Sequence, residues 1–228
     1  MKIKHSLIAT SLMAGLSLSA QAEVSGYVTL TSDYMFRGVS LNDNSPALQG
    51  GVDWAAEDSG WYAGAWASQT DDGEETDIEV DLFGGYAGEF ANGVEYDFML
   101  IYYALVDASE YNYFELHGGF SKAINDSLSL GINLDYTNDS LAASGFGDDM
   151  SALHYSVVAD VAIGEDMGLG FELGRQTWDE DGFDDDYTWG RVSLTKDWEN
   201  WSFDVSAWYN DIDGDDSSNV TASVSYNF

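Results

Sequence analysis

Asn219-Val-Thr-Ala-Ser-Val-Ser-Tyr-Asn-Phe228, the last ten residues of the chain, alternate without a mismatch between polar and apolar side chains. One face of this segment carries Val, Ala, Val, Tyr and Phe, and the other carries Asn, Thr, Ser, Ser and Asn. A period of two residues predicts a β-strand, because successive side chains of a strand point to opposite faces. The segment therefore predicts a strand with an apolar environment on one side and a polar environment on the other.

The terminal aromatic residue, Phe228, narrows the class of fold. In a bacterial outer-membrane barrel the strands are apolar toward lipid and polar toward the lumen, and the last strand characteristically ends in Phe. We therefore predict an all-β fold, a transmembrane antiparallel up-and-down β-barrel, which the barrel-assembly machinery engages through Phe228. A soluble, secreted β-sandwich is the alternative.

The N-terminus predicts a secretory signal peptide. Met1-Lys-Ile-Lys4 is basic, an apolar run follows from Leu7 to Leu18, and Ala20-Gln21-Ala22 forms an A-x-A cleavage site. We expect residues 1–22 to be removed, and residues 23–228 to form a single barrel domain in the outer membrane of a Gram-negative bacterium. An N-terminal anchor helix is the other interpretation of this segment.

Composition excludes several classes of function. Two of the seven basic residues, Lys2 and Lys4, fall in the predicted signal, which leaves five basic against 41 acidic residues and a formal net charge of −36. A nucleic-acid partner is excluded, because phosphate binding needs a basic face. The chain has no Cys and only three His, so we expect no thiolate or haem site and no cofactor. No run of 18 apolar residues follows the signal, and a strand barrel needs none.

Alternating segments recur along the whole chain after the signal. The connections between them also alternate: five are short turns rich in Gly, Asn and Asp, and six are acidic and mostly longer. Twelve strands need five turns at one end and six loops at the other, with both termini at the short-turn, periplasmic end. The twelve segments lie at about residues 24–36, 47–57, 60–69, 76–88, 93–106, 111–122, 127–137, 151–163, 167–178, 187–198, 200–210 and 219–228.

A motif of about twenty residues begins within the first of these segments and ends in the second. It comprises Thr31-Ser-Asp-Tyr-Met-Phe-Arg-Gly-Val-Ser40, then Asp43, Pro46-Ala47 and Gln49-Gly50-Gly51. The motif resembles the TSDYxFRGxS…PAxQGG segment that opens the mature chain in the TorF-type family of outer-membrane porins. The resemblance implies an outer-membrane β-barrel that acts as a porin, and it adds nothing about the solute.

The polar faces of the segments predict the side chains of the lumen. By alternation these faces carry twelve acids and two arginines, and a hydrated, negative bore is the simplest arrangement for so many carboxylates. Each arginine either forms a structural ion pair or opposes acids across the bore at a constriction. The predicted pore-lining residues are Asp33, Arg37, Asp77, Glu79, Asp81, Glu95, Asp97, Glu115 and Arg191.

Catalysis is not predicted. His154, Ser156 and Asp160 share a face, but residues two apart on one strand are separated by about 6–7 Å between Cα atoms. The chain also lacks the G-x-S-x-G turn that presents a nucleophilic serine. Alternating strands produce such sets by accident.

The acidic loops raise the question of a metal site. Asp211, Asp213 and Asp215 resemble a fragment of a calcium loop, without the Glu that closes a full twelve-residue loop. Solvated acidic loops are the favoured interpretation. Low-affinity divalent binding, with the cation bridging to lipopolysaccharide phosphates, is the alternative.

These features predict a porin, a passive, cation-preferring diffusion channel for small polar solutes. A negative lumen attracts cations and repels anions, so the lumen acids would select by charge. The alternative is a non-conducting barrel that serves as an anchor or binds partners through its loops. Large inward side chains favour that alternative, because they could fill a twelve-strand bore: Tyr62, Trp66, Tyr103 and Trp208.

Overall fold

The computed structural model describes residues 23–71, 77–106, 108–138, 150–179, 186–212 and 217–228. Twelve strands form a closed antiparallel barrel, which confirms the predicted fold class and strand count. In chain order the barrel strands are β1 (Glu23–Thr31), β4 (Ala47–Ala55), β5 (Trp61–Gln69), β6 (Ile78–Glu89), β7 (Glu95–Leu105), β8 (Tyr113–Ala123), β9 (Leu128–Thr137), β10 (Ser151–Ala162), β11 (Met167–Asp179), β12 (Tyr187–Trp198), β13 (Trp201–Asn210) and β14 (Ser217–Asn227).

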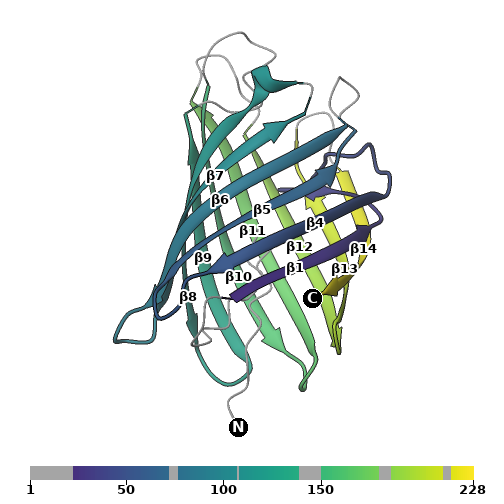
Figure 1. The fold of residues 1–228 in the computed structure, drawn as a ribbon. Coiled ribbons are helices and arrows are strands. Elements are labelled where there is room, and N and C mark those ends of the chain that lie inside the picture. The colour runs from purple at the N-terminus through teal and green to yellow at the C-terminus, as the bar shows by residue number, and fades with distance from the viewer. Residues whose placement is uncertain (1–22, 72–76, 107, 139–149, 180–185, 213–216) are drawn as a thin grey trace.

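The first and last strands close the barrel. β1 pairs with β4 on one side and with β14 on the other, so every barrel strand has two neighbours (Figure 1). The backbone of Gly26 exchanges two hydrogen bonds of 2.9 Å with Phe228, which extends the seam to the last residue. Closure leaves no sheet edge, which is what a sheet surrounded by hydrocarbon requires.

Burial is inverted relative to a water-soluble protein. On β10, for example, Val157 is 54% exposed on the outside, whereas the preceding residue, Ser156, is 3% exposed on the inside. Large apolar side chains point outward all around the wall, and most strands carry Ser, Thr, Asn, Asp, Glu or His inward, whereas the inner face of β5–β7 also carries aromatic and aliphatic side chains. An apolar exterior around a polar interior is the pattern of a barrel that spans a membrane.

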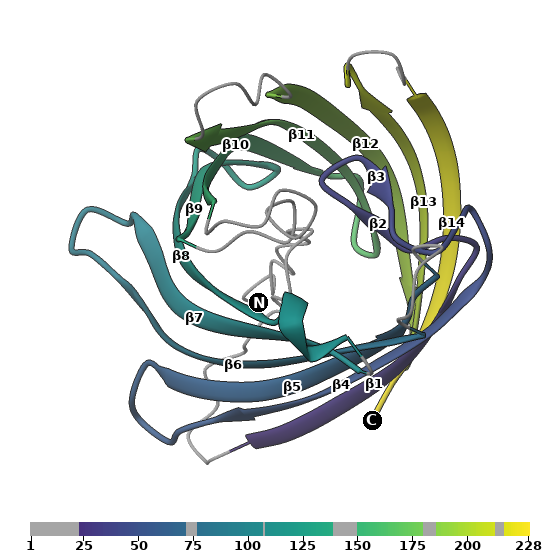
Figure 2. The same cartoon turned by 90° about the horizontal axis from the view of Figure 1, so that it is seen from above.

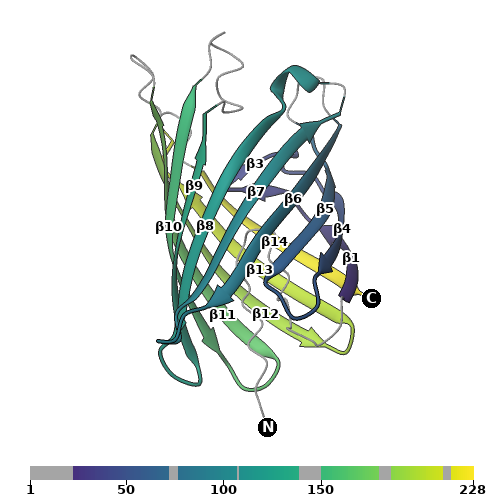
Figure 3. The same ribbon diagram turned by 60° about the vertical axis from the view of Figure 1, so that its left-hand side comes forward.

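The connections differ at the two ends of the barrel. Five short turns join β4–β5, β6–β7, β8–β9, β10–β11 and β12–β13, and the longer connections join the other consecutive strands (Figure 3). A positive φ occurs in the short turns at Asp58, Gly93, Gly164 and Glu199. A short 3₁₀ helix, Ser109–Tyr111, interrupts the connection before β8. Within the described ranges no helix is long and apolar enough to cross a membrane, a finding that has no bearing on spans made of strands.

The first predicted segment differs from the structure. Alternation extended it to Phe36, but β1 ends at Thr31 and the chain turns into the barrel. There β2 (Met35–Phe36) and β3 (Val39–Ser40) form a small hairpin, which lies inside the ring of strands beside β12 and β13 (Figure 2). Alternation groups Tyr34 and Phe36 with Val28 and Leu30 on the apolar, outward face of this segment, and for Tyr34 and Phe36 that orientation is wrong. We call residues 32–46 the lumen loop.

Candidate functional site

A tight turn lets the lumen loop form its hairpin. Arg37 and Gly38 both have positive φ, 49° and 82°, a combination that suits the right-handed twist of a two-residue hairpin. An added Cβ at Gly38 would lie 2.8 Å from the Cβ of Trp189 on β12. The amide of Asn210 on β13 donates to the Gly38 carbonyl at 2.7 Å. The turn is thus packed directly against the barrel wall.

Arg37 extends from this turn to the opposite wall. Its guanidinium donates to both carboxylate oxygens of Glu115 at 2.8 and 2.9 Å, and to Gln176 at 3.2 Å. It also lies 3.6 Å from Asp135. Burial alone would lower the pKa of Arg37, but Glu115 and Asp135 raise it further than burial lowers it. The side chain is a permanent positive charge in the bore.

Asp135 on β9 joins two histidines from the neighbouring strands. His117 Nδ1 lies 2.5 Å from one carboxylate oxygen, and His154 Nδ1 lies 2.7 Å from the other. The indole N–H of Trp189 donates to His154 Nε2 at 3.1 Å, so the proton of a neutral His154 ring lies on Nδ1 and points at Asp135. The indole reaches His154 across Gly174, where an added Cβ would lie 2.5 Å from the indole nitrogen.

His117 stands between two carboxylates. Its Nδ1 contacts Asp135, and its Nε2 lies 3.8 Å from Asp97, which accepts the Tyr62 hydroxyl at 2.7 and 2.9 Å. An imidazolium suits a position with a carboxylate at each ring nitrogen. The layer of side chains at the level of Arg37 is therefore ion-paired, and its acids are not free charges.

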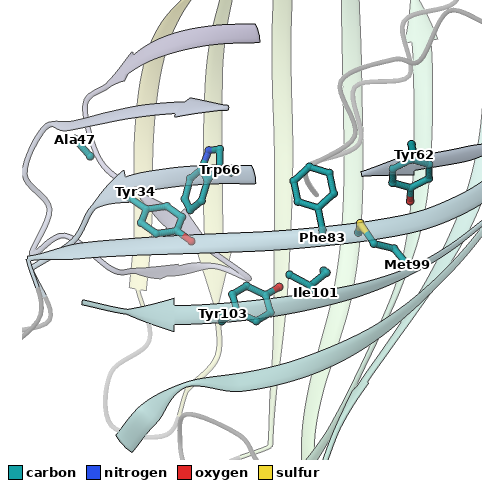
Figure 4. Packing of buried hydrophobic residues seen from close by; sticks show 8 residues of the cluster. All are labelled: Tyr34, Ala47, Tyr62, Trp66, Phe83, Met99, Ile101 and Tyr103. Atoms are coloured by element: carbon teal, nitrogen blue, oxygen red, sulfur yellow. The ribbon is translucent and has the colours of Figure 1, made fainter. Parts of the chain in front are cut away.

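The opposite side of the lumen loop is apolar. Tyr34 packs edge-on against Trp66 of β5 at 5.3 Å between ring centroids, and Phe36 packs against Tyr103 of β7 at 6.2 Å. The wall beneath them carries Phe83, Met99 and Ile101 in the same buried cluster, drawn in Figure 4. One side of the bore is thus filled by aromatic and aliphatic side chains.

Asp33 fixes the start of the lumen loop. Its carboxylate accepts from the Ser40 hydroxyl and from the Asn219 amide, both at 2.8 Å. Burial raises the pKa of Asp33, and these two donors oppose the rise. The carboxylate links the two arms of the loop to β14.

A cavity of about 760 Å³ remains inside the barrel. At the short-turn end its lining includes Glu199 and Phe228, and at its other end it meets Arg37 and Trp189 of the hairpin region. Along one side it is lined by hydroxyl groups of β1, β12, β13 and β14: Thr29, Thr31, Thr195, Ser202, Thr221, Ser223 and Ser225. The cavity thus has one side rich in hydroxyl groups, and its lining on the other side includes Trp66, Ile101 and Tyr103.

The predicted pore-lining residues fall into three groups. Two belong to the lumen loop, Asp33 and Arg37, and two are exposed near strand ends, Asp77 just before β6 and Glu95 at the start of β7. The other five are buried on the inner face of the wall: Glu79, Asp81, Asp97, Glu115 and Arg191. Among these, Arg191 pairs with Asp204 at 2.9 Å and stacks over Trp208.

Sequence reasoning missed the joining of His117, Asp135 and His154 into one cluster. The signal was present, because these three residues face the lumen and are directly opposite one another in the register of β8, β9 and β10. Alternation identifies the face of each residue but not its cross-strand partner.

Two sets of residues that the sequence analysis considered and did not favour, one catalytic and one metal-binding, can be compared with the structure. His154 uses both ring nitrogens on Asp135 and Trp189, and Ser156 donates to Glu172, so His154 and Ser156 are not joined as base and nucleophile. Of the loop acids, Asp211 is exposed, and Asp213 and Asp215 lie outside the described residues, as does the predicted signal. In the described part of the chain no group of three His, Asp or Glu side chains is arranged so that it could hold a metal ion.

Comparison with solved structures finds channel proteins of the outer membrane. The chain is similar to a KdgM porin (TM-score 0.62, 11% identity, 90% of this chain and 99% of that one) and to a NanC porin (0.61, 12%, 90% and 99%). It is also similar to the COG4313 outer membrane channel from Pseudomonas putida F1 (0.58, 12%, 92% and 96%). Identities this low establish a shared fold and nothing about the solute.

Comparison by sequence finds a family without an assigned activity. A family model described as "Bacterial protein of unknown function (Gcw_chp)" matches residues 17–227. A search of curated proteins finds no match. The family description does not mention the TorF-type motif, so that resemblance remains a prediction.

Proposed function

The chain belongs to the Gcw_chp family of bacterial proteins of unknown function, and from the geometry of its lumen we propose that it is an outer-membrane channel for small polar solutes. The observation that carries this proposal is the cavity of about 760 Å³ within a closed barrel whose exterior is apolar. A membrane barrel with a hydrated interior is a route for solutes small enough to pass its narrowest point.

The lumen loop would set that narrowest point. It occupies the bore beside β12 and β13 and is tied across to β8 by Arg37 (Figure 2). Solutes would pass along the hydroxyl-lined wall, since the wall of β5–β7 is filled by the Tyr34 and Trp66 cluster. Hydroxyl groups both donate and accept hydrogen bonds, so they replace the water shed by a polar solute.

We further propose that the channel prefers cations. Among the described residues, two arginines line the cavity, Arg37 and Arg191, together with eight acids that have some exposed surface: Asp33, Asp53, Glu115, Asp135, Glu172, Asp197, Glu199 and Asp204. Several of these acids are ion-paired at the level of Arg37, but the excess of negative charge persists toward the short-turn end. A net negative lumen attracts cations and repels anions.

The test is single-channel recording in a planar bilayer under a potassium chloride gradient. Stepwise openings with a cation-selective reversal potential are expected. An anion-selective reversal potential would overturn the proposed cation preference but not the proposed channel. The absence of any current under all conditions would overturn the channel itself.

Silence would favour a second candidate, a non-conducting barrel that acts as an anchor or binds partners through its loops. One observation supports it: the lumen loop lies inside the barrel and the side chains of Tyr62, Trp66 and Tyr103 are buried there, while Trp208 is buried on the opposite wall. A cross-linking screen against outer-membrane components would then identify the partner.

Membrane lipid and lipopolysaccharide are the proposed surroundings, in the outer membrane of a Gram-negative bacterium. Two features support this: the apolar outer surface of the barrel, and aromatic side chains at its short-turn end. There, for example, Trp201 packs edge-on against Tyr226 at 4.9 Å between ring centroids. Engagement of Phe228 by the barrel-assembly machinery belongs to the same proposal. Fractionation of the membranes, with heat-modifiable gel mobility of the intact barrel, checks the location.

A further inference from the structure

One carboxylate of the lumen has no hydrogen-bond donor. Asp81 on β6 is 0% exposed, and no N–H or O–H among the described residues donates to either of its carboxylate oxygens. An ionised carboxylate buried without a partner is strongly unfavourable. The carboxylate must therefore be accompanied by a positive ion or a proton, or the side chains that cover it must move away so that water can reach it.

The neighbour of this carboxylate is a second acid. Glu79 lies two residues away on the same face of β6, is 4% exposed, and its carboxyl group contacts that of Asp81. Two carboxyl groups in contact can hydrogen-bond only if one of them carries a proton. The lumen loop covers this pair, because the Tyr34 hydroxyl lies next to Glu79 and the Tyr34 ring packs on Trp66.

Among the residues that the structure describes, no cation is found to act on the pair. The titratable groups that interact with Asp81 from the surrounding elements are Tyr27 of β1, Tyr34 of the lumen loop, Tyr103 of β7, and Tyr113 and Glu115 of β8. The tyrosines are neutral, and Glu115 is negative and already bound to Arg37.

The surroundings favour a proton over a metal ion. Sodium or calcium needs about six oxygen ligands, whereas the groups next to each other here are two carboxyl groups and the phenol of Tyr34, with aromatic rings around them. Within the described ranges no third acid or histidine joins the pair. A shared proton needs no further ligands, and two carboxylates in contact are known to retain one.

We propose that Glu79 and Asp81 form a proton-binding site whose single shared proton keeps the lumen loop docked in the bore through Tyr34. This inference rests on the proposed channel and names its regulation. When the proton leaves to the lumen water, two adjacent negative charges remain beneath Tyr34. They repel each other and require hydration, and water reaches them only if Tyr34 moves away. Higher pH therefore favours the undocked loop and a wider bore.

The position of the loop can be tested without conduction. The chain has no cysteine, so Val39→Cys on β3 provides a single thiol that reports whether the hairpin is accessible. At each pH the rate of reaction of this thiol with a soluble maleimide is divided by the rate measured for Ala91→Cys, a thiol in an exposed turn. This ratio cancels the increase in rate that comes from ionisation of the thiol itself. Release of one proton on undocking predicts a ratio that rises about tenfold per pH unit until it reaches a plateau.

Two variants assign the effect to the pair. Asp81→Asn keeps the shape, removes the charge and donates to Glu79, so the ratio should stay at its low-pH value from about pH 5 to about pH 9. Glu79→Gln should act in the same way and covers the case in which the first variant does not fold. Asp53→Asn, an acid on the same side of the lumen, is the matched control and should keep the full pH response.

Conductance measured in parallel separates this inference from the proposed channel. A pH-dependent ratio with no conductance at any pH would overturn the channel and keep the proton site. A ratio that does not change with pH, or that changes equally in the wild type and in Asp81→Asn, would overturn the proton site. A pH response that remains in Asp81→Asn would be assigned to the cluster of His117, Asp135 and His154. Stabilisation of the docked loop by sodium or calcium instead of by acid would also overturn it.

Discussion

The guanidinium of Arg37 and the carboxylate of Glu115 meet at 2.8 and 2.9 Å although 78 positions separate them in the sequence. This contact ties a loop between the first two barrel strands to β8, across the interior of the barrel. Both side chains are largely buried, at 12% and 3% exposure. The contact makes the lumen loop part of the interior of the barrel.

Replacement of Arg37 by Ala should loosen the lumen loop. Glu115 would lose its cation in a buried position, and breaking a buried ion pair from one side typically costs about 3–5 kcal/mol. We expect a lower urea midpoint and a larger single-channel conductance. Arg175→Ala is the matched control, since Arg175 pairs with Asp186 at 3.3 Å in an exposed position. Equal effects of the two substitutions on conductance would contradict the anchoring role of Arg37.

Gly38→Ala should displace the hairpin turn. A methyl group there must accept a φ of 82° and approach the Trp189 Cβ to 2.8 Å. Gly164→Ala has a similar φ of 77° but meets nothing within 4 Å, so it carries only the backbone cost of about 1–2 kcal/mol. We expect Gly38→Ala to lower stability more and to raise conductance, while Gly164→Ala leaves conductance unchanged. An unchanged conductance in both variants would show that the turn does not limit the bore.

Trp189→Phe should free His154 from its fixed tautomer. The substitution removes the N–H that donates to His154 Nε2 and keeps the Cβ that packs near Gly38. A loss of about 0.5–1.5 kcal/mol is expected for one neutral hydrogen bond. Nitrogen NMR of the His154 ring checks the tautomer directly. Trp201→Phe, on the exposed outer face, is the control and should leave the His154 spectrum as it is.

Neighbouring residues on β9 test which face meets lipid. Ile132 is 54% exposed and outward, whereas Asn133 faces the lumen and donates to Ser156 at 3.2 Å. A lysine on the lipid face near mid-strand is expected to cost about 2–4 kcal/mol. Ile132→Lys should therefore lower the free energy of unfolding in bilayers far more than Asn133→Lys does. The reverse order would mean that the inside and outside of the barrel have been exchanged.

Most of the wall could be predicted from alternation alone. The segments expected at about 187–198 and 151–163 correspond to β12 (Tyr187–Trp198) and β10 (Ser151–Ala162), and the others agree within two residues at most ends. These strands are predictable because each has lipid on one side and a polar lumen on the other, so the period of two is imposed at every position.

The lumen loop could not be predicted in this way. Tyr34 and Phe36 continue the alternation of β1, so their spacing indicated two further outward positions. In the structure the chain leaves the wall after Thr31, and these rings pack on Trp66 and Tyr103 inside the bore. A local pattern records that one face is apolar, but it does not record whether that apolar partner is lipid or the interior of the barrel.

The sequence by itself determined the strands, the apolar face of each strand and the even number of strands. These follow from local alternation and from the length of the connections. Only the tertiary structure decided what occupies the bore. The ties from Arg37 to Glu115, from Asn210 to Gly38 and from Trp189 to His154 join residues far apart in the chain or on separate strands. Such contacts depend on closure of the barrel, which brings opposite walls within reach of one loop and buries most of the surface of these side chains, where a hydrogen bond is electrostatically stronger than in water.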